Sequence, residues 1–411
     1  MRTTRSLHPK APCASTPGNP RSLRSTSPVP TKKMRDPARP HRILQLTATS
    51  DLGGAERMVL HLVGGLDRER FTPYLCSTVG SGELVELALP VCAAVEHLRF
   101  NSPLDPAAAM RLARFIRHHQ IDLVQIHGLR AETVGRPIAR AAGAAAVVST
   151  IHSVDPWRRR VHSIMDRATL PLVTHHVAVC KAALDAALKR GEVRKGRHEV
   201  IPIGIPSPPE FSPDKIAGMR QRLGIPDDAF PVIGMLANLR EMKGHGDLIA
   251  AAVTLKRDFP KMRIICAGTD TSNGAVPAAA QTAGVDDVVF FPGFLQDTQL
   301  FLATLDIFTL PSHWEGLPVS IIEAMHAARP IVATNVGGIP EMLQDQHTAL
   351  LVPPGDPTRL VGALDRLARD SALRGQLAAA AQNRALQEFH LPTMVARYET
   401  LYERLLPQAP H

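Results

Sequence analysis

Residues Pro311–Glu341 read PSHWEGLPVSIIEAMHAARPIVATNVGGIPE, and this stretch decides the fold that the sequence predicts. The apolar run Ile307–Leu310 before it predicts a strand, and the segment from Pro318 onward predicts a helix with its first residue at that proline. Pro330–Thr334 then predicts a second strand, which a glycine-rich loop follows. A strand, a helix and a strand in this order indicate a parallel sheet covered by helices.

The same alternation continues along the chain in both directions. Seven further apolar runs predict strands: Ile43–Ala48, Leu123–Ile126, Val147–Ile151, His176–Val179, Val232–Leu236, Arg263–Ala267 and Val288–Phe291. Two stripes at helical spacing predict buried helix faces: Met58, Val59, Leu62, Val63 and Leu66 in one, and Leu248, Ile249, Ala252 and Leu255 in the other. The proline-rich segment Pro202–Pro213 interrupts the pattern and indicates a domain boundary. The sequence therefore predicts an α/β fold of two doubly wound Rossmann-like domains that face a central cleft.

The length, charge and aromatic content of the chain limit which kinds of protein it can be. The chain has 411 residues and a net charge of +9, which allows two cores and invites a nucleic-acid interpretation. Residues 1–40, however, carry nine basic residues and one acid, so the rest of the chain is almost neutral. Aromatic residues make up only 4% of the chain and offer few stacking platforms. We therefore expect no nucleic-acid partner.

Cysteine usage and hydropathy indicate the cellular setting. The five cysteines are scattered without a CxxC pair, which favours a reducing, cytoplasmic setting. No window reaches about 18 uninterrupted apolar residues, so no membrane span is expected. Residues 1–40 contain eight prolines and predict a disordered basic tail. Met34 is an alternative start, and whether residues 1–33 are translated stays open.

The quoted stretch also predicts a binding site. Glu315, Gly316 and Leu317 lie at the entrance of the predicted helix, where free backbone N–H groups and the helix dipole favour an anion. Glu323 lies roughly 8 Å further along the axis, at about 1.5 Å per residue. Two acids so placed suit the sugar and the ribose of a sugar nucleotide, since a carboxylate accepts a pair of hydroxyls. The alternative to a binding site is that Glu315 only caps the helix and Glu323 is a solvated residue on the helix surface.

A second candidate segment is Gly234–Ile249, GMLANLREMKGHGDLI. It places Arg240 and Lys243 between a strand and the following helix. Two cations beside a helix N-terminus suit a diphosphate, whose negative charge grows as it leaves. The alternative is a pair of solvated surface cations.

The first domain contributes a glycine turn and two histidines. In DLGGAE, Gly53 and Gly54 permit close approach of the backbone to a ligand. This turn is not the GxGxxG fingerprint, which disfavours a nicotinamide-dependent dehydrogenase. His127 and His152 each end a predicted strand and are expected to point into the cleft, with His152 the weaker candidate. A satisfied core histidine is the alternative for either residue.

A basic patch follows the second histidine. The segment Pro156–Arg167, PWRRRVHSIMDR, places Trp157 beside Arg158, Arg159 and Arg160. Aromatic and basic residues together favour a membrane headgroup region or a lipid diphosphate. A solvated basic face is the alternative.

The spacing of the two glutamates carries a family resemblance. Glu315 and Glu323 are separated by seven residues and stand with EGLP and GGIPE. In these features the chain resembles the family 4 glycosyltransferases, which have the GT-B fold. The resemblance implies retaining transfer, of hexosyltransferase type, from a nucleoside diphosphate sugar to a hydroxyl of a glycan or lipid-linked acceptor. It also implies polysaccharide biosynthesis, no cofactor and no metal, and the chain lacks an Asp-x-Asp triplet.

The resemblance assigns roles to residues of both domains. It implies catalytic roles for His127, Arg240, Lys243 and Glu315, and donor binding by Gly53, Gly54, Gly316, Leu317 and Glu323. His127 would lie near the reacting centre, while Arg240 and Lys243 would stabilise the departing diphosphate. The usual family pattern has a basic residue where this chain has Asn238, and Arg240 is expected to take over the role of that basic residue.

The resemblance also divides the chain. It implies an acceptor-side domain at 41–205, a nucleotide-sugar-binding domain at 206–388 and a terminal helix at 389–411 that crosses back to the first domain. The loop Phe291–Asp297 is expected to face the base of the donor. A lipid-linked acceptor would bring the enzyme to the inner face of the membrane as a peripheral protein. A sugar-nucleotide epimerase or hydrolase, or a non-catalytic sugar-nucleotide binder, remains the alternative.

Overall fold

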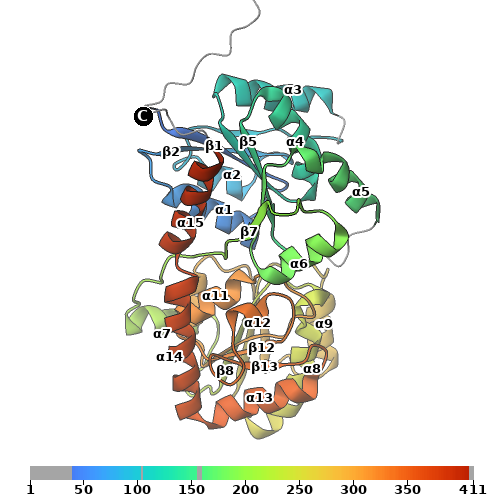
Figure 1. Ribbon diagram of the computed structural model, residues 1–411. Helices are drawn as coiled ribbons and strands as arrows, with labels where there is room; N and C mark the ends of the chain where they lie inside the picture. Colours follow the sequence, from blue (N-terminus) through green and yellow to red (C-terminus); the bar gives the residue numbers. More distant parts are fainter. Residues whose placement is uncertain (1–38, 103–104, 155–159, 407–411) are drawn as a thin grey trace, which may run out of the picture. The chain divides into compact units, whose positions relative to one another are not determined.

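The computed structural model describes residues 39–102, 105–154 and 160–406, and these residues form two parallel β-sheets. The first sheet has the strand order β3-β2-β1-β4-β5-β6-β7, and the second has the order β10-β9-β8-β11-β12-β13. Figure 1 shows the strands with the helices that surround them. In both, the chain starts in the middle, moves to one edge and returns past the first strand to build the other half. The predicted fold of two doubly wound domains is confirmed.

The strands of the first sheet are β1 (His41–Thr47), β2 (Phe71–Ser77), β3 (Val95–His97), β4 (Leu123–His127), β5 (Ala146–Ile151), β6 (His175–Ala178) and β7 (His198–Val200). Those of the second sheet are β8 (Val232–Leu236), β9 (Arg263–Ala267), β10 (Val289–Gly293), β11 (Ile307–Leu310), β12 (Ile331–Thr334) and β13 (Leu350–Val352). Every pairing within these two sheets is parallel, which requires a crossover connection between successive strands.

Helices supply most of these crossovers. The first domain contains α1 (Gly54–Gly65), α2 (Glu83–Ala88), α3 (Pro106–His118), α4 (Leu129–Ala142), α5 (Arg160–Thr169), the 3₁₀ turn η1 (Leu170–Leu172) and α6 (Lys181–Arg190). The second part of the chain contains α7 (Pro213–Arg222), the 3₁₀ turn η2 (Glu241–Lys243), α8 (His245–Asp258), α9 (Ala275–Thr282), α10 (Thr298–Ala303), α11 (Val319–His326), α12 (Ile339–Met342), α13 (Pro357–Arg369), α14 (Ser371–Glu388) and α15 (Leu391–Leu405).

The apolar stripes that the sequence predicts are the buried faces of α1 and α8. The α1 stripe buries Met58, Val59, Leu62 and Val63, and Leu66 is buried just after the helix. The α8 stripe buries Leu248, Ile249, Ala252 and Leu255. Full burial of one such large apolar side chain contributes about 1.5–3 kcal/mol relative to exposure. The period of 3.6 residues therefore identifies the faces that hold these helices on their sheets.

The structure differs from the sequence patterns at short elements and at one helix start. Pro318 is the N-cap of α11 rather than its first residue, because its ψ of 116° is extended. The patterns also miss β2, which contains Pro73, and β3, β7 and β13, which have three residues each. Three-residue strands are too short to display a period.

The last two helices pack in different places. Helix α14 packs against α11, whereas α15 packs against α1 of the first domain (Figure 1). Hydrogen bonds hold α15 there: Asp67 N donates to Glu399 Oε1 at 2.8 Å, and Arg70 Nη1 donates to Glu399 Oε2 at 2.9 Å. The tail predicted over residues 1–40 falls almost wholly outside the described residues.

Candidate functional site

A cleft of about 540 Å³ is lined by loops that follow the carboxyl ends of strands in both sheets. Its walls come from the β1–α1 loop and the end of β5 in the first domain, and from the loops after β8, β9, β10 and β11. Nine candidate residues line it: Gly53, Gly54, His152, Arg240, Lys243, Glu315, Gly316, Leu317 and Glu323. The volume lies within the roughly 300–1,000 Å³ that small-ligand sites occupy.

An ion pair connects the two sequence motifs in this cleft. Lys243 Nζ donates to Glu315 Oε1 at 2.6 Å, and Ser312 Oγ donates to the same oxygen at 2.7 Å. The carboxylate of Glu315 is buried, while the Lys243 side chain keeps 22% of its surface exposed. Glu315 therefore fixes the position of a cation that still borders the open cleft.

The local fold around η2 explains how Lys243 reaches Glu315. Gly244 follows Lys243 with a φ of +76°, and a Cβ atom there would lie 1.9 Å from the carbonyl oxygen of Pro311. His313 N also donates to Met242 O at 2.8 Å. Only glycine permits this close approach, which brings the loop after β8 against the loop after β11.

Arg240 borders the cleft in a different way. It is exposed, and it is the N-cap residue of η2 with extended backbone. Asn238, which stands where the family pattern has a basic residue, accepts a hydrogen bond from Thr269 N at 3.1 Å through Oδ1. Asn238 thus supports the loop, and Arg240 is the second cation of this loop that lines the cleft.

Glu323 lies deeper in the cleft wall, on α11. Its side chain is almost fully buried, and Oε1 accepts a hydrogen bond from Thr298 Oγ1 at 3.0 Å. Burial raises the pKa of Glu323, while the Thr298 hydrogen bond and the charge of Arg57 act to lower it. Within the described residues, Glu323 Oε2 accepts no hydrogen bond, so this oxygen is available to a ligand. An acceptor oxygen is therefore held at the cleft wall.

The glycines of the two predicted loops make close contacts, and those of Gly54 and Gly316 are with the opposite domain. A Cβ atom on Gly316 would lie 2.2 Å from His152 O, and one on Gly54 would lie 3.3 Å from Val319 Cγ2. On Gly53, a Cβ atom would lie 2.8 Å from Glu56 Oε2, which accepts the Gly53 N–H at 3.2 Å. Gly316 is therefore required for contact between the domains, in addition to its position at the entrance of α11.

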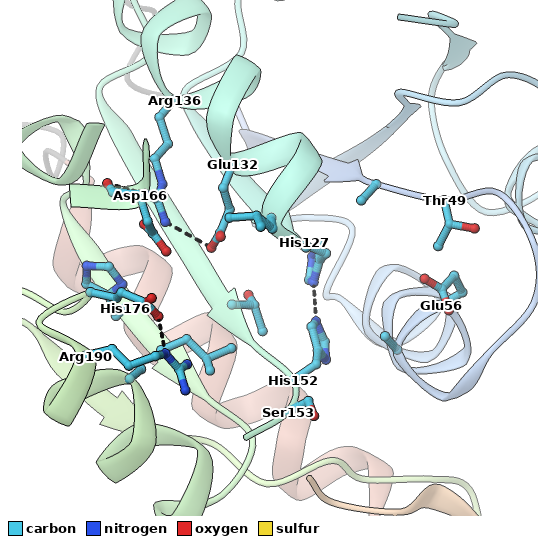
Figure 2. Close-up of a pocket in the computed structure, with 18 residues that line it drawn as sticks. Thr49, Glu56, His127, Glu132, Arg136, His152, Ser153, Asp166, His176 and Arg190 are labelled. Atoms are coloured by element: carbon cyan, nitrogen blue, oxygen red, sulfur yellow. Dashed lines mark hydrogen bonds and ion pairs between the residues drawn. The ribbon is translucent and has the colours of Figure 1, made fainter. Parts of the chain in front are cut away.

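The two histidines lie against each other. His127 Nδ1 is 2.9 Å from His152 Nε2, and His127 Nε2 is 2.7 Å from Gln45 Oε1. Burial lowers the pKa of His127 well below its ordinary value and that of His152 to about 4, so both rings are neutral at pH 7. His127 lines an adjoining smaller cavity of about 200 Å³, whereas His152 lines both spaces. Figure 2 shows the two rings facing each other.

The smaller cavity has charged walls. Arg136, which is 1% exposed, contacts Glu132 at 3.0 Å through Nη2 and donates to Asp166 through Nη1, and it ties α4 to α5 (Figure 2). Arg190 Nε donates to Glu192 Oε2 at 2.8 Å on another wall. The cavity shares Thr49, Ala55, Glu56, His152 and Ser153 with the cleft. The two spaces thus adjoin at one wall.

The predicted basic patch lies mostly outside the described residues. Trp157, Arg158 and Arg159 are among those not described, and Arg160 is the first residue of α5. On α5 itself, Val161 and Ile164 are 52% and 65% exposed. An apolar surface therefore follows directly after the patch.

The structure reveals a contact between the domains that the sequence did not assign. Glu341, the last residue of GGIPE, lies in α12, and its carboxylate accepts hydrogen bonds from Lys181 N at 2.7 Å and Ala182 N at 2.6 Å. These amides belong to the first turn of α6, whose N-cap residue Cys180 makes no side-chain cap. A side chain of the second domain therefore caps a helix of the first.

Replacing Glu341 with alanine is expected to lower the free energy of unfolding by about 1 kcal/mol, the typical effect of losing a helix cap. It should also weaken binding of the cleft ligand several-fold, because the tie between the two walls is lost. Chemical denaturation and ligand titration measure the two effects. Asp356→Ala is the matched control, since Asp356 Oδ1 caps α13 within its own domain at 3.0 Å. Equal loss of ligand affinity in both variants would contradict the assignment.

Sequence patterns missed three side chains that shape the cleft. Thr298 directly follows the loop Phe291–Asp297, but it reaches Glu323 only in the fold. Arg57 lies three residues after Gly54, so a cation near the glycine turn was visible in the sequence. Glu341 belongs to the GGIPE motif, but its partner lies 160 residues away. Pairings over such distances leave no local signal.

The described residues contain neither a membrane-spanning helix nor a metal centre. In that part of the chain, no helix is long and apolar enough to cross a membrane. Over the same ranges, no three His, Cys, Asp or Glu side chains gather as in a metal centre. The positive groups that line the cleft are the side chains of Arg57, Arg240 and Lys243, and we assign no metal ligand.

Two family models match the chain, one in each domain. The model described as Glycosyltransferase Family 4 matches residues 52–207, and the model described as Glycosyl transferases group 1 matches residues 218–384. Together they contain most of the candidate residues of the cleft, from the glycine turn to the GGIPE loop.

Similar proteins are glycosyltransferases. The 2-deoxystreptamine glucosyltransferase of Streptomyces kanamyceticus is 28% identical over 283 residues, which cover 65% of this chain and 73% of that protein. The D-inositol 3-phosphate glycosyltransferase of Stackebrandtia nassauensis is 30% identical over 275 residues, which cover 62% of this chain and 60% of that protein.

Solved structures share the fold. Anabaena HepE, solved in complex with UDP and glucose, superposes with a TM-score of 0.78 at 23% identity and covers 88% of this chain and 100% of its own. Sucrose-phosphate synthase from Thermosynechococcus elongatus gives a TM-score of 0.75 at 19% identity, over 89% of this chain and 99% of its own. With both family models in place on this fold, the chain belongs to the family 4 glycosyltransferases of the GT-B fold.

Proposed function

We propose that the protein transfers a sugar from a nucleoside diphosphate sugar to a hydroxyl of a glycan or lipid-linked acceptor, with retention of the anomeric configuration. The observation that carries this proposal is the Lys243–Glu315 pair at the entrance of α11, with Glu323 in the same cleft wall. A positioned cation and helix amides suit the diphosphate of such a donor, and the buried carboxylate of Glu323 suits the hydroxyls of its ribose.

The leaving group determines where the cations are needed. Arg240 and Lys243 line the same cleft as the N-terminal end of α11, and each offers positive charge to a diphosphate. Glu315 holds Lys243 in place before the donor arrives, so little reorganisation is needed during the reaction. That Anabaena HepE was solved with UDP supports a nucleotide donor for the present enzyme.

The reaction itself breaks the bond between the anomeric carbon and a diphosphate oxygen. The electron pair leaves with the diphosphate, the acceptor oxygen bonds to the same face of the sugar, and the acceptor proton passes to the departing phosphate. The protein supplies position and charge, and no covalent nucleophile is assigned. His127 would act near this centre through its ring contact with His152, since both of its nitrogens are engaged by protein atoms.

We place the acceptor in the smaller cavity of the first domain, because it adjoins the donor cleft at His152. Its charged walls suit a hydroxyl-rich molecule, since carboxylates accept and guanidinium groups donate hydrogen bonds. A lipid-linked glycan would bring the protein to the membrane as a peripheral enzyme on the cytoplasmic side. The exposed apolar residues Val161 and Ile164 of α5 favour such a contact.

A donor panel tests the proposal. UDP-, GDP- and ADP-sugars are incubated with the enzyme, with and without a lipid-linked glycan extract, and release of nucleoside diphosphate is measured. We expect release from one donor that depends on the acceptor, with a product whose anomeric configuration equals that of the donor by NMR. Release without acceptor would indicate a hydrolase, conversion of the donor without release an epimerase, and binding without either a sugar-nucleotide binder.

A further inference from the structure

A network of hydrogen-bonded polar side chains lies in the core of the first sheet. Gln45 on β1 and Gln125 on β4 are opposite each other in register, and both are fully buried within otherwise apolar strands. Tyr402, on α15, reaches both amides and is also fully buried. Amides placed in parallel strands are costly unless they are hydrogen-bonded, so this arrangement calls for an explanation beyond packing.

The orientations of the two glutamine amides set the direction of these hydrogen bonds. Gln125 Nε2 donates to Thr150 Oγ1 at 2.8 Å, which leaves Gln125 Oε1 as an acceptor for the Tyr402 hydroxyl. Because the single Tyr402 proton is used there, its oxygen can only accept from Gln45, whose Nε2 lies 3.2 Å away. The amide of Gln45 therefore turns its Oε1 toward His127.

This orientation determines which ring nitrogens carry protons. Gln45 Oε1 accepts at 2.7 Å, so the proton of the neutral His127 ring resides on Nε2, and Nδ1 holds a lone pair. His152 Nε2, at 2.9 Å from that lone pair, must then donate. The neutral His152 ring is left with a proton-free Nδ1, which is buried and has no hydrogen-bond partner within the described residues.

We propose that Tyr402 and Gln45 are positioning residues that fix the tautomers of His127 and His152, and that His152 Nδ1, which is covered in the resting protein, accepts a hydrogen bond from a substrate hydroxyl once substrate binding uncovers it. His152 lines both the donor cleft and the smaller cavity, and a hydroxyl is the group that both proposed substrates offer in abundance. The hydroxyl part of this inference rests on the proposed function, whereas the tautomer part depends only on the resting protein. A helix from the far end of the chain thus determines the proton arrangement at the reacting centre.

Nitrogen-15 NMR of the histidine rings tests the tautomers without any substrate. Signals are assigned from His127→Asn and His152→Asn variants of the full chain. In the wild type at pH 7, we expect both rings to be neutral with the proton on Nε2. Tyr402→Phe should let the Gln45 amide turn over and should give His127 a mixture of tautomers. An Nδ1 proton on either ring in the wild type, or unchanged tautomers in Tyr402→Phe, would overturn the proposal.

Kinetics of the same variant test the role in transfer. Tyr402→Phe is expected to lower kcat about three- to tenfold, the size of one hydrogen bond, and to leave KM for the donor unchanged. Tyr74→Phe is the control, because Tyr74 is also buried in the first domain, on β2, but packs against Phe115 and His119 rather than against the two glutamines. An equal loss of kcat in both variants would reduce Tyr402 to a packing role. If no donor is turned over by the wild type, the proposed function fails while the NMR result still decides the tautomers.

Discussion

Replacing Lys243 with alanine is expected to lower the rate of sugar transfer by about 10²–10³-fold, the range typical of losing one preorganised group that stabilises developing charge. The ammonium group borders the cleft and is held at 2.6 Å from Glu315. Its removal takes away a cation from the diphosphate and leaves the buried Glu315 carboxylate with Ser312 as its remaining side-chain partner. Measurement of kcat at saturating donor checks the prediction.

The control for Lys243 is a lysine with a similar bond but no access to the cleft. Lys256 Nζ lies 2.6 Å from Asp287 Oδ1 on the protein surface, in the helix that follows Lys243. Lys256→Ala should retain full activity, since exposed ion pairs contribute little. Lys243→Arg should retain part of the activity because the charge remains. Near-normal transfer by Lys243→Ala in a folded protein would refute the assigned site.

Replacing Glu323 with glutamine is expected to raise KM for the donor by about 10- to 100-fold, because hydrogen bonds to a charged group contribute about 1.5–3 kcal/mol. The glutamine side chain has the same shape and can still accept from Thr298, so the fold should persist. In the wild type, donor affinity should fall as the pH is lowered through the raised pKa of Glu323, because protonation removes the acceptor charge. Donor KM of the variant should lack this pH dependence.

Glu323→Gln should weaken donor binding but raise the thermal stability of the protein without donor. Because burial raises the pKa of Glu323 in the folded state, its contribution to stability is fully present below the unfolded pKa and is lost as the pH rises through the folded pKa. Without donor at neutral pH, Glu323→Gln should therefore be more resistant to thermal unfolding than the wild type. Glu388→Gln, at an exposed site on α14, is the control for both measurements. A pH-independent donor KM in the wild type would contradict this account.

Periodicity and motif spacing predicted the architecture because both are local properties of the chain. The strands β8, β9 and β11 were predicted with the bounds that the structure has, and the stripes of α1 and α8 are buried as expected. The loops after parallel strands must meet at the carboxyl edge of their sheet, so the candidate residues on the loops of one sheet were expected to lie close together.

The contacts that position these residues were beyond the reach of the sequence. Lys243 and Glu315 were assigned to different parts of a donor, yet their side chains bind each other across 72 residues. His127 was expected to face the cleft, but both of its ring nitrogens bond to protein atoms and it lines the adjoining cavity. Such pairings depend on side-chain packing in three dimensions, which neither spacing nor composition encodes.

The packing of α15 on α1 has a consequence for the order in which the protein is made. The first domain emerges from the ribosome early, but α15, which packs on it, is translated only after the whole of the second sheet. Until then, the buried amides of Gln45 and Gln125 lack the tyrosine hydroxyl that joins them. Since domains generally fold as they are synthesised, the nascent first domain must wait with an incomplete core. The hydrogen bonds that lead to His127 are therefore completed only after the second sheet has been made.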